Sequence, residues 1–287
     1  MISFIGAGPG AADLLTLRAV DRLGKADVVV WASSLVTSVV LDHCRPGVEV
    51  HDSAGMTLDE ITAVFASHPG AAIARLHSGD PSVYGAISEQ LAWCVEHERA
   101  FEIVPGVSSL AATAAAAGRE LTAPGVAQSV VLTRLAHRTA ASVPDRESVA
   151  AFARLGPTMA LFLSAARPDA LQSELSQVGS AYTPDTPALI AHRVSWPDER
   201  LVRTTVGRLA DDLRALGATT TVLVLVGDAL GTGGPPCASH VYAPHYAHAF
   251  RRATPRPAPG PTASAAPERG GGSSDPDAGR SRGDEGG

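Results

Sequence analysis

The chain has 287 residues, 45% of them hydrophobic, so it is long enough to form two packed units with cores of ordinary size. Its formal net charge of -6, from 29 acidic and 23 basic side chains, disfavours nucleic acid as a partner, because that binding depends on neutralising phosphates. Its longest apolar stretches, such as residues 28–32 and 114–117, are far shorter than the roughly 18 residues of a membrane helix, so we expect no membrane span.

The first residues and the cysteines predict a cytoplasmic protein. Residues 1–6 read directly as a buried strand, without the basic region and cleavage site of a signal peptide. Cys44, Cys94 and Cys237 lack a paired spacing, which suits a reducing compartment and predicts neither a disulfide nor a zinc site. The three histidines in residues 240–248 have no neighbouring carboxylates or thiols, so we expect no metal there either.

Strand-like and helix-like patterns alternate through residues 1–118, which is typical of an α/β domain with a largely parallel sheet. Apolar runs predict strands at residues 2–6, 27–32, 48–52, 72–77 and 101–104. Helical periodicity predicts helices at residues 11–23, 35–44, 57–68, 83–98 and 108–117. Thr57 and Glu60 have the spacing of a capping box, and Gly118 is placed to end the last of these helices.

Residues 119–231 predict a second α/β domain, with a mixed sheet. Its predicted strands are residues 128–134, 158–164, 188–195, 200–205 and 220–227. Its predicted helices are residues 146–155, 168–178 and 206–216. Only Trp196–Glu199 separates the third of these strands from the fourth, a hairpin connection that makes them antiparallel. Residues 232–287 offer little apolar surface to bury, so we expect a disordered tail.

Three glycine-containing turns follow predicted strands of the first domain, and each opens a helix-like segment. They are Gly6–Gly10, Ser78–Pro81 and Pro105–Ser109. Strand ends of an open α/β sheet form the crevice that binds its ligand, and glycine lets backbone N–H groups approach that ligand closely. Each turn alone also fits ordinary turn chemistry, but three turns at the same kind of junction predict a small-molecule site.

Familiar nucleotide and hydrolase motifs do not fit these turns. The third glycine of the first turn comes one place early for the G-x-G-x-x-G dinucleotide motif, and the second strand ends without an acidic residue for ribose. The phosphate loop G-x-x-x-x-G-K-[ST] does not occur. Leu110 stands where a nucleophile elbow requires glycine, which disfavours a serine hydrolase.

Residues 6–16, 75–85 and 104–109, which contain the three turns, resemble the tetrapyrrole methylase family of S-adenosylmethionine-dependent enzymes. Within that family, residues 52–61, 85–90 and 158–165 are similar to members that act in cobalamin biosynthesis. The resemblance covers about residues 1–230. It implies two α/β domains with a cofactor cleft between them, S-adenosylmethionine as cofactor, a tetrapyrrole substrate and a homodimer.

The resemblance assigns cofactor contacts to residues of both domains: Pro9, Ser78, Gly79, Asp80, Val83, Ser108, Ser109, Leu163, Val194 and Thr221. A sulfonium ligand with an amino-acid end needs a carboxylate and backbone donors, and its adenine needs apolar walls. Asp80 would face the cationic side of the ligand, and we expect it to act in catalysis as well as in cofactor binding. The alternative is a plain turn-forming aspartate.

Methyl transfer from a sulfonium depends mainly on alignment, so the chemistry predicts few indispensable catalytic side chains. Positioning lowers a barrier by about 7 to 11 kcal/mol, whereas one proton-transfer residue contributes roughly 3 to 5 kcal/mol. We expect Glu89 to act as a base, because the resemblance places it facing the substrate trough of related uroporphyrinogen enzymes. The alternative is an exposed helix acid. Those relatives carry arginine where this chain has Ala86, so their arginine mechanism does not transfer.

A tetrapyrrole substrate carries many carboxylates, which guanidinium groups bind through paired hydrogen bonds. The candidates for that role are Arg18, Arg119, Arg134, Arg138 and Arg193. Solvated surface arginine is the alternative for each. Three kinds of alternative function stay open. The chain could methylate one of several precorrins or cobalt-precorrins, it could methylate RNA or a protein histidine, or it could bind a corrinoid or nucleotide without catalysis.

Overall fold

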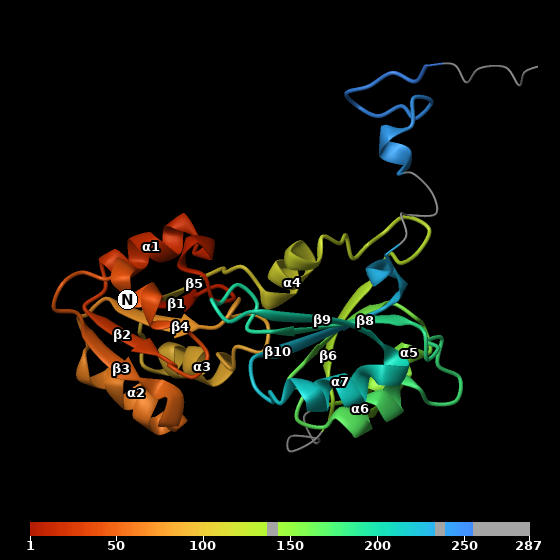
Figure 1. Cartoon of the computed structure of the whole chain (residues 1–287). Helices are drawn as coiled ribbons and strands as arrows, with labels where there is room; N and C mark the ends of the chain where they lie inside the picture. The colour runs from red at the N-terminus through yellow and green to blue at the C-terminus, as the bar shows by residue number, and fades with distance from the viewer. Residues whose placement is uncertain (137–142, 233–238, 255–287) are drawn as a thin grey trace, which may run out of the picture. The chain divides into compact units, whose positions relative to one another are not determined.

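The computed structural model describes residues 1–136, 143–232 and 239–254 (Figure 1). The chain divides into two compact units, Met1–Cys237 and Ala238–Gly287, and both β-sheets belong to the first unit. The division of that unit into domains at residues 118 and 119 stays a prediction.

The first sheet is parallel throughout. Its strands are β1 (Ile2–Gly6), β2 (Val28–Trp31), β3 (Glu49–Asp52), β4 (Ile73–His77) and β5 (Phe101–Val104). They lie in the order β3-β2-β4-β1-β5, with every pair parallel, as the alternation of patterns predicts. β1 and β4 are buried along their whole length, which is why they read as apolar runs.

Helices cover both faces of this sheet (Figure 1). α1 (Leu17–Gly24) packs Leu23 against one face, while α2 (Leu58–Ser67) and α3 (Ser88–Glu96) pack against the other. The capping box of α2 is confirmed, because Thr57 and Glu60 each accept from the other's backbone N–H.

The second sheet is mixed, as the hairpin spacing predicts. Its strands are β6 (Val130–Arg134), β7 (Thr158–Phe162), β8 (Pro187–His192), β9 (Arg200–Thr205) and β10 (Val222–Val226). In the order β6-β7-β10-β8-β9, only the β6–β7 pair is parallel.

Helices also cover both faces of the second sheet. The helices on one face are α5 (Val149–Ala153), α6 (Pro168–Leu175) and α7 (Leu209–Leu216). On the other face, α4 (Ser109–Ala117) packs Ala117 against β7, β8 and β10. α4 begins at its N-cap Ser108 and ends at Gly118, which has a φ of 64°. This helix therefore joins the last strand of the first sheet to the core of the second.

Two predicted helices of the first half are wrong in detail. Residues 11–23 form a 3-10 helix, Ala12–Leu14, followed by α1, because Thr16 is extended and caps α1 instead of continuing a helix. The 35–44 segment forms a 3-10 helix at Ser38–His43. Its β-branched residues have low helix propensity.

Left-handed backbone shortens two further predicted elements. α3 begins at Ser88 rather than at residue 83, because Tyr84 and Ala86 have φ values of 56° and 49° and the chain turns there. β8 ends at His192 rather than at residue 195, because Arg193 and Ser195 have φ values of 49° and 67°.

Part of the predicted tail is described. Residues 239–254 contain a 3-10 helix, His240–Tyr242, and a bridge between His248 and Arg251. The remainder of the tail lies outside the described residues. No helix among the described residues is long and apolar enough to cross a bilayer.

Candidate functional site

The three glycine turns converge because they follow adjacent strands. β1 lies between β4 and β5, and its residue Ile5 is level with Leu76 on one side and Val104 on the other. All three strands are parallel, so their carboxyl ends, and the turns that follow, lie along one edge. This edge is where open α/β sheets bind ligands.

Glycines hold these turns at backbone-to-backbone distance. Gly8 and Gly79, with φ values of 73° and 65°, form a bridge in which each N–H donates to the other's carbonyl, at 3.2 and 2.8 Å. A Cβ on Gly106 would lie 2.2 Å from the carbonyl oxygen of Gly79 and 2.7 Å from the Cα of Gly6. Gly8 and Gly79 are therefore required by their left-handed φ, and Gly106 is required because no side chain fits at its contacts.

Asp80 ties the second turn to the third. One carboxylate oxygen accepts from the Ser82 N–H at 2.8 Å, and the other accepts from the Gly106 N–H at 3.0 Å. The side chain is half-buried. Asp80 therefore has the turn-forming role that was its alternative interpretation, and it also fixes a negative charge at the strand ends.

A cavity of about 300 Å³ opens beside the converging turns. It is lined by all ten residues expected to contact a cofactor: Pro9, Ser78, Gly79, Asp80, Val83, Ser108, Ser109, Leu163, Val194 and Thr221. This volume is at the lower end of the roughly 300–1,000 Å³ typical of ligand sites. Both sheets contribute to the walls, because the lining combines the first sheet's turns with residues from the ends of β7, β8 and β10. Their contact with a cofactor stays a prediction.

Several non-glycine residues of this cavity have left-handed backbone. Tyr84, Leu163 and Thr221 have φ values of 56°, 53° and 55°. Such conformations cost about 1 to 3 kcal/mol each and are concentrated at functional sites. Leu163 is also 73% exposed, although it is a large apolar side chain. The cavity thus holds an apolar residue in a strained conformation at its surface.

Tyr84 and Phe162 are wall residues that the sequence did not single out. Their ring centroids lie 5.2 Å apart at an interplanar angle of 45°, and both line the cavity. Burial raises the pKa of Tyr84, and the nearby charge of Arg134 partly opposes that increase. The sequence shows Tyr84 as an aromatic residue three positions after Pro81, the end of the second turn, but only the fold brings Phe162 against it.

A buried polar network supports the turn that carries Tyr84. The Arg75 guanidinium donates to Gln90 at 3.1 Å and to Ser53 at 2.8 Å, and the Gln90 amide donates to the Ala86 carbonyl at 3.1 Å. Burial lowers the pKa of the neighbouring His77, and the Gly85 backbone partly opposes that decrease. Because these side chains start on β4, α3 and the segment after β3, the network fixes the turn against three elements.

Glu89, the expected base, is exposed in the first turn of α3 and does not line the cavity. Its catalytic role stays a prediction. Ala86 is also exposed.

Of the five arginines expected to bind substrate, the four that the structure describes are dispersed. Arg18 is exposed on α1, and Arg119 follows Gly118 with its Nε buried and unpartnered. Arg193 pairs with Asp198 at 2.6 Å. Arg134 ends β6, level with Phe162 of β7, a wall residue of the cavity. The fifth, Arg138, lies outside the described residues.

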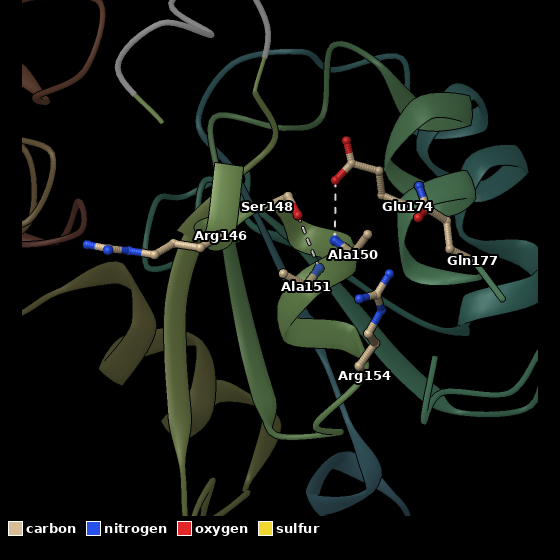
Figure 2. A pocket seen from close by; sticks show the side chains of 7 residues that line it. All are labelled: Arg146, Ser148, Ala150, Ala151, Arg154, Glu174 and Gln177. Carbon is tan, nitrogen blue, oxygen red and sulfur yellow. Dashed lines mark hydrogen bonds between the residues drawn. The ribbon is translucent and has the colours of Figure 1, made fainter. Parts of the chain in front are cut away.

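Figure 2 shows a second pocket, of about 390 Å³, beside α5 and α6. Its polar groups stabilise the short helix α5, because Ser148 accepts from the Ala151 N–H at 3.1 Å and Glu174 accepts from the Ala150 N–H at 3.3 Å. Arg146 points away from the other lining residues. None of the described residues that are expected to contact cofactor or substrate lines this pocket. Among the described residues no cluster of His, Cys, Asp or Glu could hold a metal ion.

Comparison with known proteins gives consistent matches over most of the chain. The model of the family described as Tetrapyrrole (Corrin/Porphyrin) Methylases matches residues 1–210. A precorrin-4 C(11)-methyltransferase of a Sinorhizobium species is 43% identical over 252 residues, which cover 87% of this chain and 98% of that protein.

Two solved structures extend the comparison to the fold. The structure of a cobalamin biosynthetic enzyme, cobalt precorrin-4 methyltransferase, matches with a TM-score of 0.76 and 40% identity, covering 80% of this chain and 95% of that one. A uroporphyrin-III C-methyltransferase from Thermus thermophilus, in complex with S-adenosylhomocysteine, matches with a TM-score of 0.65 and 27% identity, covering 80% and 92% of the two chains.

Proposed function

The chain belongs to the tetrapyrrole methylase family, and on that premise we propose that it transfers a methyl group from S-adenosylmethionine to carbon 11 of precorrin-4, giving precorrin-5 in cobalamin biosynthesis. The 43% identical relative, almost all of whose length is matched, carries that name. The observation that carries the proposal is the single cavity lined by all ten expected cofactor residues, which come from six separate parts of the chain.

The residues of this cavity fit the methyl donor. Asp80 supplies a fixed negative charge for a cationic ligand, and the neighbouring turns offer backbone groups that glycine leaves accessible. Val83, Leu163 and Val194 supply apolar wall for an adenine. A neighbour that shares the fold is complexed with S-adenosylhomocysteine, the demethylated product, which supports the same assignment.

Catalysis by this chain would be mainly positioning. When bound, S-adenosylmethionine supplies a methyl group already activated by a positively charged sulfur. The glycine turns and Asp80 hold their own geometry through backbone hydrogen bonds, so they would orient a ligand without rearranging. Tyr84 and Phe162 would exclude water from the wall facing the acceptor. Glu89 is the proposed proton acceptor, and its exposed position on α3 makes it accessible to a large substrate.

Of the five candidate arginines, Arg134 is the one that we propose to bind substrate carboxylates. It lies at the end of β6, beside Phe162, and its positive charge acts to lower the pKa of Tyr84. The cobalt-containing form of the substrate is a second candidate, because the structure with the TM-score of 0.76 is a cobalt precorrin-4 methyltransferase. We also propose a cytoplasmic homodimer, to be tested by sedimentation equilibrium of the purified protein.

The test has two stages. Titration calorimetry with S-adenosylhomocysteine should show binding to the intact protein, and the variant Asp80→Ala should weaken it by about tenfold or more, since charge-assisted hydrogen bonds contribute about 1.5 to 3 kcal/mol. Asp185→Ala, at an exposed position, is the matched control. Incubation with precorrin-4 and ¹³C-methyl donor, followed by NMR of the product, should place the label on carbon 11.

Several results would contradict the proposal. A label on another carbon would indicate a different precorrin methylation, and turnover of cobalt-precorrin-4 alone would identify the second candidate. Binding of the corrinoid without any transfer would indicate a noncatalytic module.

A further inference from the structure

The loop between β8 and β9, residues 193–199, lies directly against the first glycine turn. The Trp196 indole N–H donates to the Pro9 carbonyl at 2.9 Å, and the Ala11 N–H donates to the Ser195 hydroxyl at 3.0 Å. The residues joined by the first contact are 187 positions apart in the chain, and those joined by the second are 184 positions apart. They connect the second sheet's hairpin to the turn that follows β1.

Gly10 shows how closely the two segments fit. A Cβ placed on Gly10 would lie 2.1 Å from Cδ1 and 2.4 Å from Nε1 of Trp196. Because the φ of Gly10 is not left-handed, its lack of a side chain is needed for space and not for backbone conformation. The indole of Trp196 therefore occupies the space that the Cβ of any other residue at position 10 would need.

The hairpin is built to hold the indole in this orientation. The Arg193 guanidinium lies 5.1 Å from the centre of the Trp196 ring and pairs with Asp198 at 2.6 Å. The Ser195 N–H donates to the Glu199 carboxylate at 2.6 Å. Arg193 and Ser195 both have left-handed φ values, a strained backbone that these contacts stabilise.

Both ends of this contact lead to the same cavity. Pro9, whose carbonyl accepts from Trp196, lines the cavity on the side of the first sheet. On the side of the second sheet, Val194 lines it, and the Arg193 N–H donates to the carbonyl of Thr221, another lining residue, at 2.9 Å. Two walls contributed by different sheets are thus linked to each other by the Trp196 indole and the Ser195 hydroxyl.

We infer that Trp196 is a positioning residue for the methyl-donor site: with Ser195 and the space left by Gly10, it holds the Pro9 turn at the distance from Val194 and Thr221 that the donor requires. This inference rests on the proposed function. Trp196 does not line the cavity, so its effect is on donor affinity and not on the transfer step. Contacts that served only to stabilise the fold would change the unfolding midpoint without changing affinity.

Three variants test the inference independently. Trp196→Phe keeps a ring but removes the N–H donor, Ser195→Ala removes the second hydrogen bond, and Gly10→Ala forces the indole away. We expect each to raise the Kd for S-adenosylhomocysteine by about three- to tenfold, the range for one lost hydrogen bond. At saturating donor, kcat should stay within about twofold of wild type, so the loss appears in the KM for the donor.

Trp93→Phe is the matched control, because Trp93 packs its ring on Phe65 in the core of the first sheet, away from the cavity. It should lower the unfolding midpoint while leaving the Kd unchanged. A double-mutant cycle adds a sharper test: Gly10→Ala should weaken binding much less in a Trp196→Ala background than in wild type, because the space it needs is then free.

The outcomes are distinguishable from failure of the proposed function. Wild-type protein that binds no S-adenosylhomocysteine would overturn the proposed function itself. If the wild-type protein binds S-adenosylhomocysteine and the three variants bind it with the same Kd, only the role of Trp196 would be overturned. Additive effects in the double-mutant cycle would have the same meaning. Circular dichroism of each variant confirms that the compared proteins are folded.

Discussion

His77 is a buried histidine at the end of β4, under the turn that carries Tyr84. Burial, and then the charge of Arg75, lower its pKa to about 3, and its Nε2 has no hydrogen-bond partner. Its ring lies 6.0 Å from that of Phe4. The native structure therefore contains a neutral imidazole, whereas the unfolded chain would bind a proton near pH 6.5.

This difference predicts a loss of stability in mild acid. A histidine with a lowered native pKa contributes stability above pH 6.5, and the contribution falls as the pH decreases from 6.5 towards 3. Between pH 7 and pH 5 the wild type should lose about 2 kcal/mol of unfolding free energy through this residue. His77→Gln should remove that portion of the pH dependence in urea titrations. An identical pH dependence in both proteins would contradict the assignment.

The glycine turns act as a unit in which three strand ends are packed backbone against backbone. Gly106→Ala would place a methyl group 2.2 Å from the Gly79 carbonyl oxygen, so the second and third turns must separate. We expect a loss of about 1 to 3 kcal/mol in stability, typical of overpacking, together with loss of measurable S-adenosylhomocysteine binding. Gly55→Ala is the control, because nothing lies within 4 Å of its Cβ position. Equal behaviour of the two variants would show that turn packing does not form the site.

The capping box of α2 should contribute to the free energy of unfolding without affecting the cavity, because it lies outside the cavity lining. Thr57→Ala removes the acceptor for the Glu60 N–H and should cost about 0.5 to 2 kcal/mol of unfolding free energy. Because neither residue lines the cavity, the Kd for S-adenosylhomocysteine should not change. Chemical denaturation and calorimetry on the same preparation check both parts, and a weakened Kd would imply coupling between α2 and the site.

Ligand binding should stabilise both sheets together, because the cavity has walls from each. At a free concentration of about 100 times its Kd, a ligand adds about 2.7 kcal/mol, which corresponds to a rise in Tm of roughly 5–10 °C for units of this size. Differential scanning calorimetry should show one transition that moves as a whole. Two transitions, of which only one moves, would mean that the ligand contacts one sheet alone.

The sequence by itself determined the elements whose causes are local. The parallel first sheet follows from alternating apolar runs and helical patterns, the capping box from Thr57 and Glu60, and the end of α4 from Gly118. The family resemblance also pointed to ten of the residues that line the cavity. Those in the glycine turns could be recognised because the turns are short contiguous motifs.

Local patterns were insufficient where the backbone is left-handed. Tyr84, Ala86, Arg193 and Ser195 interrupt predicted elements with left-handed φ values. Three of them contact distant segments: Tyr84 packs on Phe162, Arg193 donates to the Thr221 carbonyl, and Ser195 accepts from the Ala11 N–H. Apolar periodicity through such segments indicates burial but does not reveal that the backbone turns.

Only the tertiary structure decided which distant residues share the cavity and what holds its walls together. The pairing of Tyr84 with Phe162, the neutral state of His77 and the contact of Trp196 with Pro9 each depend on two or more segments widely separated in sequence. Burial, distance and orientation arise when the two sheets pack, and a linear pattern contains none of them.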